Sequence, residues 1–268
     1  MTALLLTTDG GLEDVAADEF RELADTEELA HGEIELKPFD LDGRVRIPTD
    51  EPADRLVPTA RRMRSIHHVL RYVHTFEFDR DDPSQSIYGA VRDQPLEEVE
   101  SASAFRVTSN RYGDHAFTSM DVQDWAGQAV VDAYGTDVDL ENYDADVRVD
   151  VVADRCLIGI QYTRRALSKR HPRAFSPKVS LKTNVAFAML RMARIPEHEP
   201  DVLLDPFCGA GTIPIEAAAL HPELTVRASD WWNRAVDGAR ENAEAADVAD
   251  RTTFAEVDAR QLTDHYGE

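Results

Sequence analysis

The chain has 268 residues, 51 of them Asp or Glu and 29 Lys or Arg, which gives a formal net charge of −22 at pH 7. That length is enough for two or three domains, each with its own core. The sequence has no run of eighteen apolar residues and no basic-then-apolar start, which argues against a membrane span and a signal peptide and predicts a cytoplasmic protein. Its two cysteines, Cys156 and Cys208, are too few for a disulfide framework or a metal cluster.

Charge is distributed unevenly along this acidic chain. Only four residues are lysine, and acidic runs such as 244–250 are interspersed with alanine. This composition predicts a halophilic source, because an acidic surface keeps proteins soluble at high salt. Two segments nevertheless contain no acid: 55–76 has five arginines and three histidines, and 155–196 has ten Lys or Arg. Since phosphate binding depends on Lys and Arg, these segments predict a nucleic-acid partner; the alternative is that they are solvated faces.

The first 75 residues alternate strand and helix signals. The expected elements are a strand at 3–8, a helix at 11–23, strands at 34–36 and 45–47, a helix from Pro52 to about Leu70 and a strand at 72–78. Asp42-Gly43 is a turn signal between the second and third of these strands. The order strand–helix–strand–strand–helix–strand predicts a ferredoxin-like unit.

A second α+β region follows. The expected elements are a short helix at 84–92, a strand at 104–109, an amphipathic helix that ends near 131 and a hairpin of strands at 147–152 and 156–162. Arg106, Arg111 and His115 lie on or just after the first of these strands. They are candidate phosphate contacts, and the alternative is that each is an ordinary surface residue.

Residues 164–178 read as a basic linker, because Pro172 and Pro177 oppose a continuous helix and no acid is present. Such a segment is expected to lie along a nucleic-acid path. Next, 179–193 predicts a helix whose buried face carries Leu181, Val185, Ala188 and Met192.

A glycine turn follows a short apolar strand in the segment 202–216. Val202-Leu-Leu204 suits a parallel strand covered on both faces. Gly209 and Gly211 allow a close ligand approach, and Pro214 is tolerable only in the first turn of the helix that follows. Pro214 also replaces the third glycine of a dinucleotide fingerprint, and no Gly-Lys-Ser/Thr is present, so neither that motif nor a P-loop matches.

Acidic residues end three successive strand signals. Asp205 ends the strand before the glycine turn, Asp230 ends the segment 224–230, and Asp258 ends the segment 253–258. Each acid taken singly is explained by a helix cap or a solvated turn. Three in register predict a nucleoside pocket, with Asp230 spaced to accept the hydroxyls of a ribose.

The stretch Asp205-Pro-Phe-Cys-Gly-Ala-Gly-Thr-Ile-Pro-Ile-Glu-Ala-Ala218 resembles the S-adenosylmethionine loop of class I methyltransferases, in particular the group with a THUMP RNA-binding domain. The opening Leu5-Leu-Thr-Thr-Asp-Gly-Gly-Leu-Glu-Asp14 and the pattern Phe105-Arg-Val…His115-Ala-Phe-Thr-Ser119 are similar to the same family. The resemblance implies an α+β N-terminal region, ferredoxin-like over 1–75 and THUMP over 76–163, with the basic linker over 164–178. A Rossmann-like α/β class I methyltransferase domain over 179–268, cut off after about three strands, would follow.

In that family the loop wraps the methionine end of the cofactor, and the acids that match Asp230 and Asp258 meet the ribose and the adenine. Trp231 stands where an apolar residue often contacts the adenine ring; the alternative is core packing. The implied cofactor-binding residues are Asp205, Pro206, Phe207, Gly209, Ala210, Gly211, Thr212, Asp230, Trp231, Asp258 and Ala259. The implied tRNA-binding residues are Arg106, Arg111, His115, Arg164, Arg165, Lys169, Arg170, Arg173, Lys178 and Lys182. Leu181-Lys-Thr183 resembles an element that helps to close over the cofactor.

By resemblance, the reaction is methyl transfer from S-adenosylmethionine to the N2 amine of a guanosine in tRNA, with position 6 favoured over position 10. We expect a monomer that binds no metal. The family's catalytic Asp/Asn-Pro-Pro-aromatic motif is absent from the sequence, so no catalytic residue is assigned. A competing hypothesis is therefore an RNA-binding THUMP protein or fragment with an incomplete, inactive methyltransferase domain. A DNA or protein methyltransferase shares the cofactor loop but does not account for the THUMP-like region.

Overall fold

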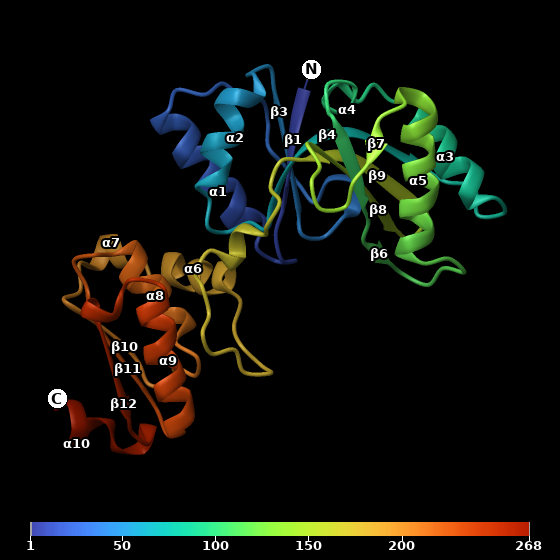
Figure 1. Cartoon of the computed structure of the whole chain (residues 1–268). Helices are drawn as coiled ribbons and strands as arrows, with labels where there is room; N and C mark the ends of the chain where they lie inside the picture. Colours follow the sequence, from blue (N-terminus) through green and yellow to red (C-terminus); the bar gives the residue numbers. More distant parts are fainter. Residues whose placement is uncertain (1, 268) are drawn as a thin grey trace. The chain divides into compact units, whose positions relative to one another are not determined.

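The structure is a computed structural model that describes residues 2–267, and its backbone divides into two compact units (Figure 1). The first consists of the described residues up to Met63 together with His68–Arg165. The second consists of Arg64–His67 together with the residues from Ala166 onward. No helix in the described part of the chain is long and apolar enough to cross a membrane.

One sheet organises the first unit. Within residues 2–165 nine strands pair in the order β2-β3-β1-β4-β9-β8-β5-β7, with β6 beside β8. The strands are β1 (Thr2–Thr7), β2 (Glu35–Leu36), β3 (Arg44–Thr49), β4 (His68–Glu77), β5 (Ala104–Thr108), β6 (Arg111–Tyr112), β7 (Asp137–Val138), β8 (Ala145–Val152) and β9 (Arg155–Gln161). Since β4 pairs with both β1 and β9, the sheet continues across residue 75, where the sequence predicts a domain boundary.

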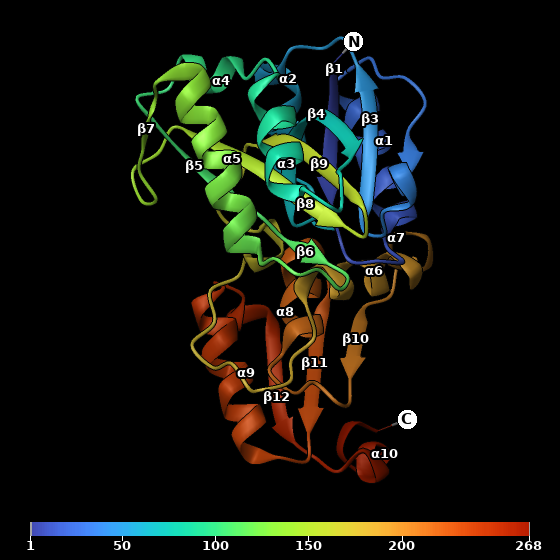
Figure 2. The same ribbon diagram turned by 90° about the vertical axis from the view of Figure 1, so that its right-hand side faces the viewer.

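The helices of this unit are α1 (Glu13–Thr26), η1 (Pro38–Asp40), α2 (Ala53–Arg61), α3 (Pro83–Arg92), α4 (Glu97–Glu100) and α5 (Ser119–Tyr134). Three of them, α1, α3 and α5, lie close to their expected positions. Local chemistry defines α5 at both ends: Thr118 and Asp121 form a reciprocal capping box, and Gly135 ends the helix in the left-handed region. Figure 2 shows α3 and α5 over the sheet, and Phe105, Ile87 and Val122 are buried in the core there.

Two helix predictions were wrong in part. The helix expected to reach Leu70 ends at Arg61, and His68 already begins β4, because Val69 and Leu70 pair with β1 in register. Cross-strand pairing outweighs the helical spacing of this segment. The helix expected from 179 begins at Thr183 (α6, Thr183–Met192), so that Leu181 precedes it, and Met192 is 79% exposed. The buried face instead includes Thr183, and Asn184, whose side chain donates to the Ser65 carbonyl.

The second unit is built on a parallel sheet in the order β10-β11-β12, within the residues described. The bounds are η2 (Leu167–Lys169), α7 (Ile195–His198), β10 (Val202–Asp205), α8 (Thr212–Leu220), β11 (Thr225–Asp230), α9 (Asn233–Ala245), η3 (Ala249–Arg251), β12 (Thr252–Glu256), η4 (Ala259–Gln261) and α10 (Leu262–Tyr266). These bounds confirm the three predicted strands, and α9 connects β11 to β12. The succession β10-α8-β11-α9-β12 is the Rossmann-like pattern expected of this part of the chain.

The expected burial of β10 on both faces was wrong. Leu203 packs with the α6, α8 and β11 core, whereas Val202 is 42% and Leu204 39% exposed. Residues that alternate along a strand point to opposite faces, and among the described residues β10 pairs with β11 alone. Within the described residues the strand therefore lies at an edge of the sheet. The face that carries Val202 and Leu204 is partly exposed.

A buried ionic cluster joins distant strands of the first unit. Asp150 of β8 accepts from the Arg44 guanidinium at 2.9 Å, from the Asn110 N–H at 2.9 Å and from the Arg148 side chain. Asp150 and Arg44 are both buried. Burying these charges is costly, and the pairing offsets that cost.

Asp150→Asn should therefore destabilise the protein, by about 3 kcal/mol, because it leaves buried guanidinium charge uncompensated. Asp18→Asn, which removes an exposed helix ion pair with Arg21, serves as the control and should change stability by less than about 0.5 kcal/mol. Denaturant unfolding followed by circular dichroism measures both. Equal effects of the two substitutions would contradict the structural role of the buried cluster.

Candidate functional site

The loop between β10 and α8 is held in one conformation by hydrogen bonds and by glycine. The Cys208 N–H donates to the Ser229 carbonyl at 2.9 Å, and the Gly211 N–H donates to the Cys208 carbonyl at 2.8 Å. Gly211 has φ 81° and caps α8, and a Cβ there would meet the Ala239 Cβ at 3.1 Å. Both the left-handed backbone and the close packing therefore require glycine at this position.

Asp230, at the carboxyl end of β11, closes the loop. One carboxylate oxygen accepts from the Gly209 N–H at 3.0 Å and the other accepts from the Trp232 N–H at 3.0 Å. Each carboxylate oxygen has two lone pairs, so both keep an acceptor position for ligand hydroxyls. Asp230 thus shapes the loop and can still bind a diol.

Asp205 lies at the carboxyl end of β10, beside β11, which ends at Asp230. Burial raises the pKa of the Asp205 carboxyl, the negative charge of Asp230 raises it further, and the Phe207 N–H, which donates to it at 3.0 Å, opposes both effects. Burial, with the charges of the two acids, raises the pKa of the Cys208 thiol to about 12. That thiol is therefore protonated and unreactive, and its burial indicates a packing role.

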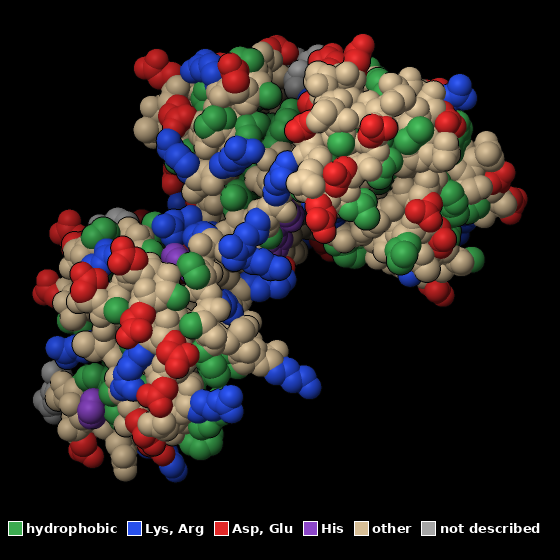
Figure 3. Space-filling view, viewed as in Figure 1, with side chains coloured by type: hydrophobic (Ala, Val, Ile, Leu, Met, Phe, Trp, Pro, Cys, Tyr) green, Lys and Arg blue, Asp and Glu red, His purple; other side chains and the backbone are tan. Residues whose placement is uncertain are grey.

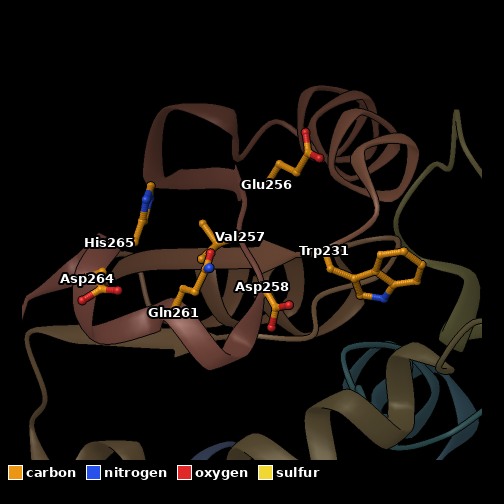
Figure 4. Close-up of a pocket in the computed structure, with 7 residues that line it drawn as sticks. All are labelled: Trp231, Glu256, Val257, Asp258, Gln261, Asp264 and His265. Carbon is orange, nitrogen blue, oxygen red and sulfur yellow. The ribbon is translucent and has the colours of Figure 1, made fainter.

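An open pocket of about 600 Å³ lies beyond β12, lined by Trp231, Glu256, Val257, Asp258, Gln261, Asp264 and His265. Figure 4 shows the Asp258 carboxylate between the side chains of Trp231 and Gln261. The Trp231 indole is 72% exposed, so it is available as a stacking surface and is not a core residue. Hydrogen bonds from the Arg260 side chain and N–H lower the pKa of Asp258 to about 2, which keeps this carboxylate ionised.

The structure brings only part of the predicted cofactor set to this pocket. Trp231 and Asp258 line it, whereas Ala259 begins η4 without lining it. Other members belong to the glycine loop, where Phe207 is exposed and Ala210 and Thr212 are buried. Sequence reasoning missed Glu256, Val257, Gln261, Asp264 and His265. The rule that ligands bind at the carboxyl ends of parallel strands could have found the first two.

Several of the predicted RNA-binding residues of the first unit are engaged within it. The Arg106 guanidinium pairs with Asp146 at 2.6 Å and lies 4.1 Å from the centre of the Tyr143 ring. Arg111 donates to the Gly113 carbonyl and to the His115 ring. Arg164 stacks on the same Tyr143 ring, 4.4 Å from its centre.

In the second unit, Arg170 and Arg173 contact α8 through Glu216 and Thr212, respectively. The side chains of Lys169, Lys178 and Lys182 are exposed, as is that of Arg165 at the end of the first unit. Acidic side chains are dispersed over the surface of each unit, as Figure 3 shows.

A parallel β-α-β-α-β unit with a glycine loop, an acid at the tip of its second strand and a pocket beyond its third defines a nucleoside-cofactor domain of the Rossmann-like class. Comparison with known families agrees. Residues 74–161 match the THUMP domain, and residues 170–268 match the RMKL-like methyltransferase domain.

The chain is 36% identical over 264 residues to the tRNA (guanine(6)-N2)-methyltransferase of Thermus thermophilus, which covers 98% of this chain and 74% of that protein. It is 34% identical over 212 residues to the enzyme of the same name from Archaeoglobus fulgidus, with 67% and 53% covered. The crystal structure of TrmN from Thermus thermophilus superposes with a TM-score of 0.74 at 35% identity, covering 99% of this chain and 76% of that one. The chain belongs to the family of S-adenosylmethionine-dependent methyltransferases that carry a THUMP domain.

As pH rises, Asp205→Asn should become more stable relative to the parent protein, whereas Asp258→Asn should become less stable relative to it. The pKa of Asp205 is higher in the folded protein than in the unfolded chain, where it is near 3.9. Ionisation of Asp205 therefore lowers the stability of the parent protein as pH rises above about 3.9. Asp205→Asn avoids this loss, so the variant should gain stability relative to the parent as pH rises. The folded pKa of Asp258 is about 2, so its contribution is present above about 3.9 and lost as pH falls through 2. Asp258→Asn should therefore lose stability relative to the parent at neutral pH.

Difference unfolding curves between pH 2 and pH 7 measure both effects. Shifts of the same sign for the two variants would contradict the assigned causes, namely burial for Asp205 and the Arg260 partner for Asp258.

Proposed function

We propose that this protein transfers the methyl group of S-adenosylmethionine to the N2 amine of a guanosine in tRNA, with position 6 favoured over position 10. The observation that carries the proposal is the 36% identity, over 98% of this chain, to a tRNA (guanine(6)-N2)-methyltransferase. The chain spans just over half the length of the Archaeoglobus relative, and 60% of a relative of the same name from Methanocaldococcus jannaschii. The activity of the whole protein is therefore part of the proposal.

The residues present fit the methyl donor. The exposed Trp231 ring offers a stacking face for the adenine, and the ionised Asp258 can accept a hydrogen bond from the adenine amine. The free lone pairs of Asp230 suit the two ribose hydroxyls. No atom lies within 4 Å of the place where a Cβ on Gly209 would stand, so the glycine loop leaves room there for the methionine end.

The donor supplies an electrophilic methyl group on sulfur. The protein's contribution is to hold the guanine amine in line with that group and to exclude water. Because the amine lies inside a paired stem, the guanosine has to leave its stack to reach the pocket.

The THUMP region and the exposed cations provide the RNA side of the proposal. Among the predicted RNA-binding residues, Lys169 and Lys178 of the second unit have exposed side chains in the basic stretch 155–196. Cations on an otherwise acidic surface are expected to direct phosphates to one path. We propose a monomer in the cytoplasm as the working form.

Trp231→Ala should weaken the binding of S-adenosylmethionine about tenfold, because the loss of one stacking aromatic costs about 1–3 kcal/mol. Thermal stability should be unchanged, since the ring is exposed. Trp232→Ala is the matched control, because this neighbouring ring does not line the pocket. Isothermal titration calorimetry measures the affinity of each variant for S-adenosylmethionine. Equal affinities for the two variants would contradict a role of Trp231 in binding the cofactor.

Methyl transfer to an unmodified tRNA transcript should depend on guanosine at position 6. Replacing that nucleotide should abolish incorporation of labelled methyl, whereas replacing the guanosine at position 10 should leave it intact. Mass spectrometry of the nucleosides identifies N2-methylguanosine. Binding of tRNA and cofactor without transfer would support an RNA-binding protein instead, and transfer to position 10 would overturn the preferred target.

A further inference from the structure

The side chain of Asn242 links two segments of the second unit that are far apart in sequence. Asn242 lies on α9 and is 1% exposed. Its Oδ1 accepts from the Phe175 N–H at 2.9 Å, and its Nδ2 donates to the Phe175 carbonyl at 2.8 Å and to the Ala210 carbonyl at 3.0 Å. Phe175 belongs to the expected linker, and Ala210 lies between the two glycines of the cofactor loop. One amide therefore joins the linker to the loop.

The Phe175 ring is seated on the same helix one turn earlier. A Cβ at Gly238 would lie 2.1 Å from the Phe175 Cδ1, so only glycine leaves room for the ring. Residues four apart share a helix face, and Gly238 and Asn242 thus form one surface that receives the ring and the backbone of Phe175.

Two further anchors lie earlier in the same stretch. Arg173 donates to the Thr212 hydroxyl at 3.2 Å and to the Leu181 carbonyl at 3.1 Å. Arg170 and His171 contact the Glu216 carboxylate, which is fully buried and also pairs with Arg64 at 2.7 Å. These partners pull the pKa of Glu216 down against the effect of its burial. The segment Arg170–Phe175 is therefore fixed to α8 and to α9, and through Asn242 it is linked to the loop.

We propose that Arg170–Phe175, which we call the clamp segment, holds the cofactor loop in its binding conformation, and that Asn242 is the positioning residue of this device. Gly209 and Gly211 carry positive φ angles, and a loop with two glycines has many conformations to lose when it orders. Fixing the peptide between them removes that cost before the ligand arrives. The inference rests on the proposed function, because the ligand of the loop is taken to be S-adenosylmethionine.

The substitution Asn242→Asp tests the clamp by pH. The new carboxylate can still accept from the Phe175 N–H, but it faces the Phe175 and Ala210 carbonyls without a proton to donate. We expect about tenfold weaker binding of S-adenosylmethionine at pH 8 relative to the parent protein, from the loss of two buried hydrogen bonds. At pH 5 the ratio of the dissociation constants of the variant and the parent should move back toward one. Burial favours the protonated carboxyl, which restores a hydrogen-bond donor. Calorimetry on the full chain gives the ratio at each pH.

Gly238→Ala is a second, independent variant. It displaces the Phe175 ring and leaves Asn242 intact, and it favours helix formation in α9, so weaker binding cannot be ascribed to loss of the helix. Glu241→Gln, at an exposed position on the same helix, is the control and should bind as the parent does. Parent-like affinity in both Asn242→Asp and Gly238→Ala, or a ratio for Asn242→Asp that does not change with pH, would overturn the proposal.

Failure of the proposed function is distinguishable from failure of the clamp. If the parent protein binds no S-adenosylmethionine, the proposed function fails, and hydrogen exchange of the loop amides 209–212 then decides the clamp alone. Faster exchange at these amides in Asn242→Asp, with the rest of α8 unchanged, supports the clamp. Exchange equal to that of the parent overturns it.

Discussion

The second unit depends on the way in which the carboxylate of Asp230 ties the glycine loop to the tip of β11. The two glycines permit the turn but do not select it, and hydrogen bonds from the Gly209 and Trp232 amides supply the selection. The same carboxylate accepts from the Trp232 N–H, next to Trp231 of the pocket beyond β12. A ligand that reaches from the loop to Trp231 therefore meets a surface that is already formed.

Burying an acid is costly unless it is paired, and each unit pairs some of its buried acids with arginine. In the first unit Asp146 and Asp150 pair with guanidinium groups from β3, β5 and β8. In the second unit, the Glu216 carboxylate contacts Arg64, Arg170 and His171. Part of the cationic enrichment in the two acid-free segments thus serves internal ion pairs, because an unpaired buried carboxylate costs several kcal/mol. An acid-free run in a sequence is not by itself a map of a phosphate path.

Most of the regular structure could be predicted because local signals and tertiary packing agree there. The capping box at Thr118 and the runs rich in valine, isoleucine and leucine in β8 and β9 indicate a helix start and two strands from a few residues each. The wrong helix predictions followed helical spacing that tertiary contacts override. Leu70 lies in a strand because it pairs with β1. Leu181 precedes α6, whose buried face includes the polar residues Thr183 and Asn184. Similarly, nothing in the apolar run of β10 indicates that one of its faces lies open.

The sequence by itself determined the class of fold, the glycine loop and the acids Asp205, Asp230 and Asp258, because these features are spaced by strand and turn geometry that is local. Only the tertiary structure decided that the expected linker binds α8 and α9, that Arg106 and Arg170 face carboxylates, and that His265 lines the pocket. The physical reason is that side-chain partners are chosen by packing between segments 40 to 152 residues apart, and no local pattern records that choice.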